Sequence, residues 1–300
     1  MTGVYLIKKN STVLDLIVTT TLLLFMGFIT YRVSVELNYH WDWGVIPQYL
    51  LRWDEEKGRW TSNILFDGFL TTIRLSLWSI FFATIIGIFI GILRTRKRLL
   101  LRLIGRSYVE LIRNIPPLVL VFIFYFFVSD QLMLLLGVEE FIRNRSGTSV
   151  QWLGFIVAPV ELFTAFVSGV LTIAMFQGAY IAEIVRAGIQ SVDNEQWEAS
   201  AALGLTWWQQ MRFIILPQAA KRVLPPLVNE FINTIKYSSI VSIISIQELT
   251  FQGMQVMSST QRTNEVWLTI SLMYFLLCFA ISVLARRLEI AMAEVTLQSA

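Results

Sequence analysis

Residues 191–217 read SVDNEQWEASAALGLTWWQQMRFIILP, a polar stretch rich in small residues that is set between strongly apolar segments. Its first half predicts a short helix, because Asp193 and Gln196 have the spacing of a capping box. Gly204 predicts the end of that helix, since glycine adopts at little steric cost the left-handed conformation that closes helices.

The second half of the stretch predicts another short helix. Thr206 and Gln209 repeat the capping-box spacing, which indicates a helix start at Thr206. Pro217 disfavours helical conformation at Leu216, so the helix is predicted to end there. The stretch is therefore expected to be a pair of short helices joined at Gly204.

The spacing of these residues resembles the EAA loop of permease subunits from ATP-binding-cassette (ABC) importers, and residues 191–217 are called the EAA loop below. Residues 180–191 and 217–249 resemble the polar amino-acid uptake branch of that family. Ser200 stands where the family usually has alanine, and Glu195 where the branch usually has glycine. The matching positions, which the resemblance implies contact an ATPase, are Gln196, Glu198, Ala199, Ser200, Gly204, Leu205, Ile214, Leu216 and Pro217.

The resemblance implies a transporter subunit that is not an enzyme. Two permease subunits, identical or related, would form the pathway, two separate ATPase subunits would dock on the EAA loop, and an extracytoplasmic binding protein would deliver a polar amino acid. ATP and Mg²⁺ would be bound by the ATPase subunits, because this chain lacks the G-x-x-x-x-G-K-[ST] motif. Its single cysteine and single histidine exclude a Cys/His metal cluster within one chain, so no cofactor is expected.

The composition places the chain in a lipid bilayer. Of its 300 residues 55% are hydrophobic and 15% charged, which is too apolar for an ordinary soluble domain. We expect an all-α membrane protein with six transmembrane helices, an additional N-terminal helix followed by a five-helix permease core. The predicted spans are residues 13–31, 68–93, 108–128, 162–186, 223–246 and 266–285.

The distribution of basic residues predicts the orientation. Fourteen of the 24 Lys and Arg residues fall on one side of these spans, seven fall on the other, and the run from Arg94 to Arg98 is the strongest cluster. By the positive-inside rule, the richer side is cytoplasmic. Both termini and the EAA loop are therefore predicted to lie in the cytoplasm, with the chain in the cytoplasmic (inner) membrane.

The chain divides into three predicted parts. Residues 1–65 hold the first helix and a Trp-rich connector, which is expected on the outer face as an interfacial helix or loop, since tryptophan prefers the headgroup level. A contact of this connector with an external partner is left open. Residues 66–290 form the permease domain, and residues 291–300 a C-terminal tail.

Polar residues inside the predicted spans are candidates for the translocation pathway, because ionisable groups at membrane depth usually face a partner or a watery cavity. Lys236 shares a helix face with two asparagines and has Glu230 beside it. The alternative is a purely structural role, in which Glu230 or an acidic group on another helix neutralises Lys236. Glu183 can also form a simple ion pair with Arg186. The candidates are Arg113, Asn114, Glu183, Asn229, Glu230, Asn233 and Lys236.

A different class of transporter is also compatible with these charges. An ion-coupled secondary transporter would use Lys236 and Glu230 in its pathway, and a channel is a third possibility. Secondary transporters usually contain internal repeats. The sequence shows no convincing repeat, which favours the importer.

Overall fold

The computed structural model is largely helical and forms two compact units, residues 1–43 and residues 44–300, each of which is described by itself. The residues that the structure describes are 4–36, 39–56, 58–135, 137, 154, 156–159 and 162–298.

The first unit is dominated by helix α1, Val4–Glu36. Its stretch Val13–Arg32 is long and apolar enough to cross a membrane, and in the most apolar part of this stretch no residue is buried. A helix that is apolar all round and packs against nothing within its unit is suited to contact with lipid on every side. The predicted first span is thus present as a helix.

The Trp-rich connector contains a structure that the sequence analysis missed. Helix α2, Ile46–Leu50, is followed by strands β1, Leu51–Asp54, and β2, Arg59–Ser62, which pair antiparallel. Trp53 lies opposite Trp60, with ring centroids 5.6 Å apart in an edge-to-face arrangement. Cross-strand aromatic pairs stabilise such hairpins. The chain was predicted to be all-α, and this connector to be a helix or loop; the two strands show that both predictions are wrong for residues 51–62.

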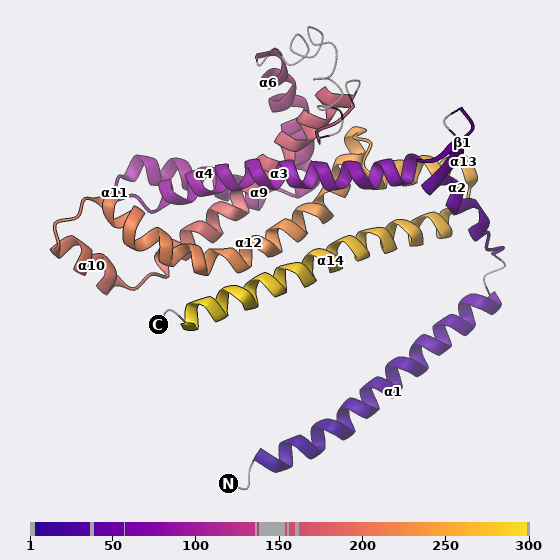
Figure 1. Ribbon diagram of the computed structural model, residues 1–300, viewed down its shortest axis with the longest axis horizontal. Helices are drawn as coiled ribbons and strands as arrows, with labels where there is room; N and C mark the ends of the chain where they lie inside the picture. The colour runs from indigo at the N-terminus through magenta and orange to yellow at the C-terminus, as the bar shows by residue number, and fades with distance from the viewer. Residues whose placement is uncertain are drawn as a thin grey trace. The chain divides into compact units, whose positions relative to one another are not determined.

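The second unit is built on helices α3, Ile64–Arg94, and α9, Phe163–Gln190, which pack along their length. Figure 1 shows α12, Leu216–Ser238, and α14, Thr263–Gln298, running beside them. Helix α9 is central, because 72% of the residues in its most apolar stretch are buried, against 11% of those in the most apolar stretch of α14.

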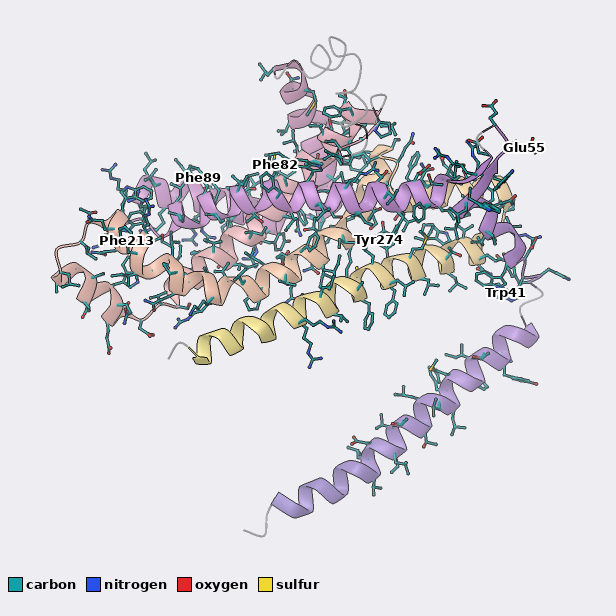
Figure 2. All side chains as sticks on the ribbon, viewed as in Figure 1. Trp41, Glu55, Phe82, Phe89, Phe213 and Tyr274 are labelled. Atoms are coloured by element: carbon teal, nitrogen blue, oxygen red, sulfur yellow. The ribbon has the colours of Figure 1, made fainter. Side chains whose placement is uncertain are left out.

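Small residues allow α3 and α9 to approach closely. A Cβ atom added at Gly87 would lie 2.4 Å from Cγ2 of Ile181, and one at Gly91 would lie 2.9 Å from the carbonyl oxygen of Ala182. Figure 2 shows the large side chains of α3, such as Phe89, on its outer face. The small residues of this stripe on α3 are all buried: Thr72, Ser76, Ser79, Ala83, Gly87 and Gly91.

The number of spans differs from the prediction. Within the described residues, four helical segments are long and apolar enough to cross a membrane: Val13–Arg32, Ile64–Arg94, Phe163–Gln190 and Thr263–Arg287. A fifth arises if α4, Leu99–Asn114, and the segment Pro117–Val128 form one broken span, bent by 117°.

The bend has a local cause. Pro116 and Pro117 lie at the break, and Pro117 occupies the first turn of α5, Pro117–Ile123, where its missing N–H costs nothing. The predicted span 223–246 is not covered by one α-helix, because α12 ends at Ser238 and a 3₁₀-helix, Ser239–Ile244, follows. Charged and amide side chains also lower the hydropathy of α12.

The stretch between the predicted third and fourth spans, residues 129–161, is described only in part. A π-helical turn, Phe124–Ser129, leads into α6, Asp130–Leu135. Arg143 and Arg145 lie outside the described residues.

A buried carboxylate joins three helices at the far end of the second unit. Glu248 caps α13, Leu249–Thr260, by accepting a hydrogen bond from the backbone N–H of Phe251 at 2.8 Å. Its other oxygen accepts from the Tyr274 hydroxyl of α14 at 2.6 Å and from the Thr72 hydroxyl of α3 at 3.4 Å. Burial raises the pKa of the Glu248 carboxyl above its usual range.

Candidate functional site

The first helix of the EAA loop is α10, Asn194–Ala202. Asp193 precedes it at the N-cap position as predicted, but its side chain makes no capping hydrogen bond, so the predicted capping box is wrong. The Gln196 side chain instead accepts a hydrogen bond from Gln218 of α12 at 3.3 Å. This contact between segments takes the place of the expected local one.

The junction between the two helices has the predicted glycine geometry. Gly204 has φ +74°, and its N–H donates to the carbonyl oxygen of Ala201 at 2.9 Å. The N–H of Leu205 donates to the carbonyl oxygen of Ser200 at 3.3 Å. Ser200 is fully buried, and its hydroxyl donates to the carbonyl oxygen of Trp197 at 2.9 Å. The turn is thus fixed by hydrogen bonds on both sides of Gly204.

The second helix, α11, Trp207–Gln210, begins with the predicted capping box. The Gln209 side-chain oxygen accepts from the Thr206 N–H at 2.8 Å, and the Thr206 side chain accepts from the backbone N–H of Gln209.

The predicted end of this helix at Pro217 is wrong. A π-helical turn, Met211–Ile215, joins α11 directly to α12, which begins at Leu216. The N–H of Leu216 donates to the carbonyl oxygen of Met211, five residues back, and Pro217 follows in the first turn of α12, where its missing N–H is tolerated. The EAA loop therefore continues into α12 without a flexible hinge.

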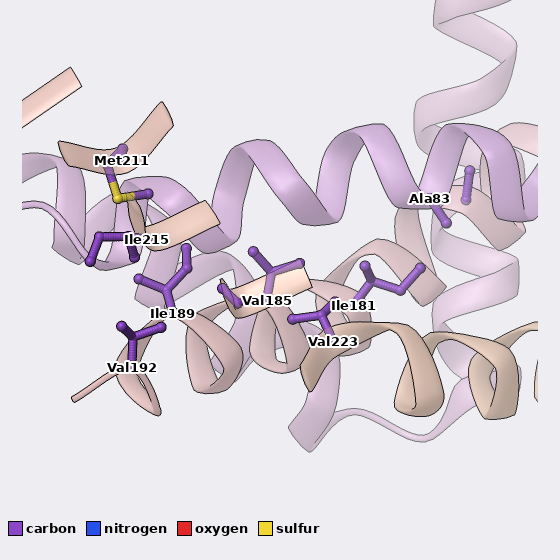
Figure 3. Close-up of a cluster of buried hydrophobic side chains, with 10 residues drawn as sticks. Ala83, Ile181, Val185, Ile189, Val192, Met211, Ile215 and Val223 are labelled. Carbon is purple, nitrogen blue, oxygen red and sulfur yellow. The ribbon is translucent and has the colours of Figure 1, made fainter. Parts of the chain in front are cut away.

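The inner side of the EAA loop packs into an apolar core between α9 and α12 (Figure 3). Met211 and Ile215 are fully buried there against the end of α9. Arg222 of α12 also donates to the carbonyl oxygen of Ser191, which ties the first residue of the loop to α12. The residues of this core are Ala83, Ala174, Ile181, Val185, Ile189, Val192, Met211, Ile215, Ala219 and Val223.

The opposite side of α10 is open and composed mainly of small residues. Glu198 and Ala199 are exposed, as are Ala201 and Ala202. Leu203 has 77% of its surface exposed directly before Gly204, and the sequence analysis missed it. Its position could have been noticed in the sequence, because Leu203 is an apolar residue immediately before the glycine that closes the helix. Small side chains around one large apolar side chain form a surface on which another protein can pack closely.

A pocket of 540 Å³ lies where α4 meets the C-terminal end of α9. Glu183 forms ion pairs with Arg186, as predicted, and with Arg94 at the end of α3, which was missed. The residues that line this pocket are Arg94, Arg102, Arg106, Val109, Glu110, Arg113, Asn114, Glu183, Arg186 and Gln190. Five arginines against two glutamates give it an excess of positive charge.

Besides Glu183, two other predicted pathway residues line this pocket, both of them on α4. The guanidinium of Arg113 lies 5.7 Å from the ring centre of Tyr180 on α9, within the range of a cation–π contact. The Asn114 side chain donates to the carbonyl oxygen of Glu110 at 2.7 Å and to its carboxylate at 3.3 Å. Both residues stay exposed at the mouth of the pocket.

A second, larger groove of 980 Å³ lies between α12, α13 and α14. Asn229, Asn233 and Lys236 line it, which confirms that they share one face of α12. Lys236 is exposed, and within the described part of the chain no carboxylate pairs with it. The alternative in which Glu230 neutralises Lys236 is therefore wrong.

Glu230 faces a different helix. The Gln177 side-chain amide of α9 donates to the Glu230 carboxylate at 3.2 Å and to the Thr234 hydroxyl at 2.9 Å. The seven predicted pathway residues thus fall into three places: the basic pocket, the α12–α14 groove and the contact between α9 and α12.

Among the described residues, no group of three or more His, Cys, Asp or Glu side chains could hold a metal ion.

Comparison with known proteins identifies the family. Residues 83–294 match the family model described as binding-protein-dependent transport system inner membrane component. The chain belongs to this family. The resemblance to ABC importer permeases of the polar amino-acid branch is thereby confirmed, and the relatives are permease subunits, not enzymes.

Several curated relatives share about a third of their residues with this chain. A probable glutamine ABC transporter permease protein, GlnM of Bacillus subtilis, is 33% identical over 76% of this chain and 94% of its own length. The glutamine transport system permease protein GlnP of Escherichia coli K12 is 31% identical over 75% and 91%. The glutamate/aspartate import permease protein GltJ of the same organism is 31% identical over 80% and 90%.

Solved structures show the same fold. A crystal structure of an amino acid ABC transporter with histidines superposes with a TM-score of 0.63 at 31% identity, covering 84% of this chain and 99% of the other. The MetNI methionine ABC transporter in an inward-facing conformation gives a TM-score of 0.57 at 19% identity, covering 76% and 95%.

Proposed function

We propose that this chain is the permease subunit of an ABC importer that moves polar amino acids across the cytoplasmic membrane. ATP hydrolysis in separate ATPase subunits would drive the import, through docking on the EAA loop. The observation that carries this proposal is the two-sided EAA loop, which exposes Leu203 and small residues on one side and is rooted in a buried core on the other.

The docking contacts are assigned to the exposed part of the EAA loop. Glu198 and Ala199 face outward on α10, so they are available to a partner, whereas Ser200 and Gly204 set the shape of the turn. Ile214, Leu216 and Pro217 lie in the continuous helix that leads to α12. We assign to these residues the role of transmitting movement from the docking surface to α12, since the helix is continuous from Met211 into α12.

The substrate class rests on the relatives. Those compared above are named for glutamine or for glutamate and aspartate, and the chain spans nine tenths or more of their length. The basic pocket beside Arg113 and the amide-lined groove beside Lys236 offer groups that can bind a carboxylate or an amide. These surfaces are the proposed places where a polar amino acid meets the chain.

The proposed assembly contains two permeases, two ATPase subunits and an extracytoplasmic binding protein. The excess of Lys and Arg around the α3–α4 turn and the EAA loop supports a cytoplasmic position for both termini and for the loop. The sequence lacks the G-x-x-x-x-G-K-[ST] motif, so we assign the nucleotide and its Mg²⁺ to the partners.

Transport in proteoliposomes tests the proposal. The chain is reconstituted with its candidate ATPase, and uptake of labelled glutamine or glutamate is measured with binding protein outside and ATP or no nucleotide inside. We expect uptake only when ATP and binding protein are both present. Uptake driven by a proton or sodium gradient without ATP would overturn the proposal in favour of an ion-coupled transporter.

A further inference from the structure

A basic and aromatic pocket lies at the turn between α3 and α4, separate from the two surfaces assigned to transport. It has a volume of 390 Å³. Its lining comes from two segments about a hundred residues apart: Arg96, Lys97, Arg98 and Leu101 from the turn and α4, and Trp207 and Trp208 from α11. The lining contains three cations and no carboxylate.

One of the three cations is fixed by the aromatic residues. The guanidinium carbon of Arg96 lies 3.6 Å from the ring centre of Trp207 and 4.8 Å from that of Trp208. Such cation–π contacts hold the turn against the second helix of the EAA loop. The pocket is therefore a defined contact between two segments, and not only a run of basic residues in the sequence.

The other two cations remain available for a ligand. Lys97 and Arg98 are exposed, and no carboxylate in the described part of the chain pairs with either. Arg98 is also the residue that precedes α4, so the first N–H groups of that helix add to the positive potential.

The surroundings of the pocket favour a lipid over a protein as the source of that anion. Leu99 and Leu100 follow the basic run directly and are exposed, the latter at 69%, and Leu103 and Ile104 continue the exposed apolar surface of α4. Trp208 is 64% exposed on the other side of the pocket. Basic side chains next to exposed leucine and tryptophan are typical of a protein surface at the boundary between headgroups and acyl chains.

We propose that this pocket binds the phosphate headgroup of an anionic phospholipid from the cytoplasmic leaflet, with the acyl chains along the apolar surface of α4. The proposal rests on the cytoplasmic placement of the EAA loop given above. Because Trp207 and Trp208 belong to that loop, the bound headgroup would contact the segment on which the ATPase subunits are proposed to dock.

The test measures lipid binding to the full-length chain in detergent, without its partners. Short-chain phosphatidylglycerol and phosphatidylcholine are titrated against the wild type and a Lys97→Gln, Arg98→Gln variant, with Trp fluorescence as the readout. We expect phosphatidylglycerol to bind more tightly, and the variant to lose roughly thirtyfold, since each basic side chain near anionic lipid contributes about fivefold. Both substitutions are at exposed positions, so the fold is expected to persist.

A matched variant separates a site from general charge attraction. Arg286→Gln, Arg287→Gln removes the same charge from exposed positions on α14, outside the pocket, and should bind phosphatidylglycerol as the wild type does. An equal loss in both variants, or equal binding of the two lipids, would overturn the proposal. So would full displacement of the lipid by inorganic phosphate, which would identify a free anion site instead.

Loss of ATPase co-purification in the Lys97, Arg98 variant, with lipid binding unchanged, would assign the pocket to protein docking and also overturn the proposal. The outcome is independent of the transport assay, because lipid binding is measured without ATP, binding protein or substrate. A chain that binds phosphatidylglycerol here but transports nothing would leave the lipid site standing while the proposed function fails.

Discussion

Substitution of Gly204 by alanine should weaken the docking of the ATPase subunits without removing any side chain that they contact. Gly204 has φ +74°, and no heavy atom lies within 4 Å of the position that a Cβ would occupy. Alanine therefore causes no clash, and the only penalty is conformational. A left-handed backbone costs a non-glycine residue about 1–2 kcal/mol.

This penalty sets the size of the expected effect. If the observed turn is the form that docks, then about 1–2 kcal/mol corresponds to a decrease in ATPase affinity of up to about 5- to 30-fold. The affinity is measured by titrating the purified ATPase onto the full-length permease immobilised in detergent. Melting temperature and membrane yield of Gly204→Ala should stay close to wild type, because the exposed turn can relax out of the left-handed conformation in the free chain.

Asparagine at the same position is the matched control. It tolerates the left-handed conformation better than alanine does although its side chain is larger. Gly204→Asn should therefore bind the ATPase more tightly than Gly204→Ala. Wild-type affinity in Gly204→Ala, or a weaker affinity in Gly204→Asn than in Gly204→Ala, would refute the argument that backbone conformation at Gly204 controls docking.

Three other substitutions test separate parts of the structure. Glu198→Lys reverses an exposed charge on α10 and should abolish transport-coupled ATP hydrolysis while protein yield is kept. Lys236→Ala should reduce uptake at least tenfold with an unchanged melting temperature, since Lys236 is exposed in its groove; loss of folded protein would instead indicate a structural role. Burial raises the pKa of Glu248, so its stabilising contribution is full below the ordinary carboxyl pKa and declines as pH rises through the raised value. Glu248→Gln should remove that decline from the melting temperature, and parallel pH profiles for the two proteins would contradict it.

Features that depend on local geometry could be predicted from the sequence. The packing stripe of α3 follows from small residues at helical spacing, and the burial of Gly87 and Gly91 confirms it. The turn at Gly204, the capping box at Thr206 and the break at Pro116 likewise depend on residues adjacent in the chain. The family resemblance rests on the same short-range spacing, which explains why it could be recognised before the fold was known.

Features that depend on contacts between segments could not be predicted. Gln196 was expected to complete a capping box, but Gln218 of α12 binds its side chain. Pro217 was expected to end a helix, but the π-helical turn before it leads the helix onward and buries Met211 and Ile215. Periodicity places Glu230 beside Lys236 on α12, yet it cannot show that Glu230 faces Gln177 of α9, because that depends on how α12 lies against its neighbours.

Helix α9 connects the EAA loop with two of the three polar sites. Its end, Gln190, directly precedes the loop, Glu183 lies two turns earlier in the basic pocket, and Gln177 binds Glu230 of α12 further along. Because Arg222 of α12 also holds the carbonyl oxygen of Ser191, the loop is attached to both helices. Any displacement of the loop must therefore move the C-terminal end of α9 and the N-terminal end of α12 together. The ion pair of Glu183 with Arg94 joins α9 to α3, which is not attached to the loop in this way. We infer that such a movement would strain this ion pair before it strains the contacts between α9 and α12.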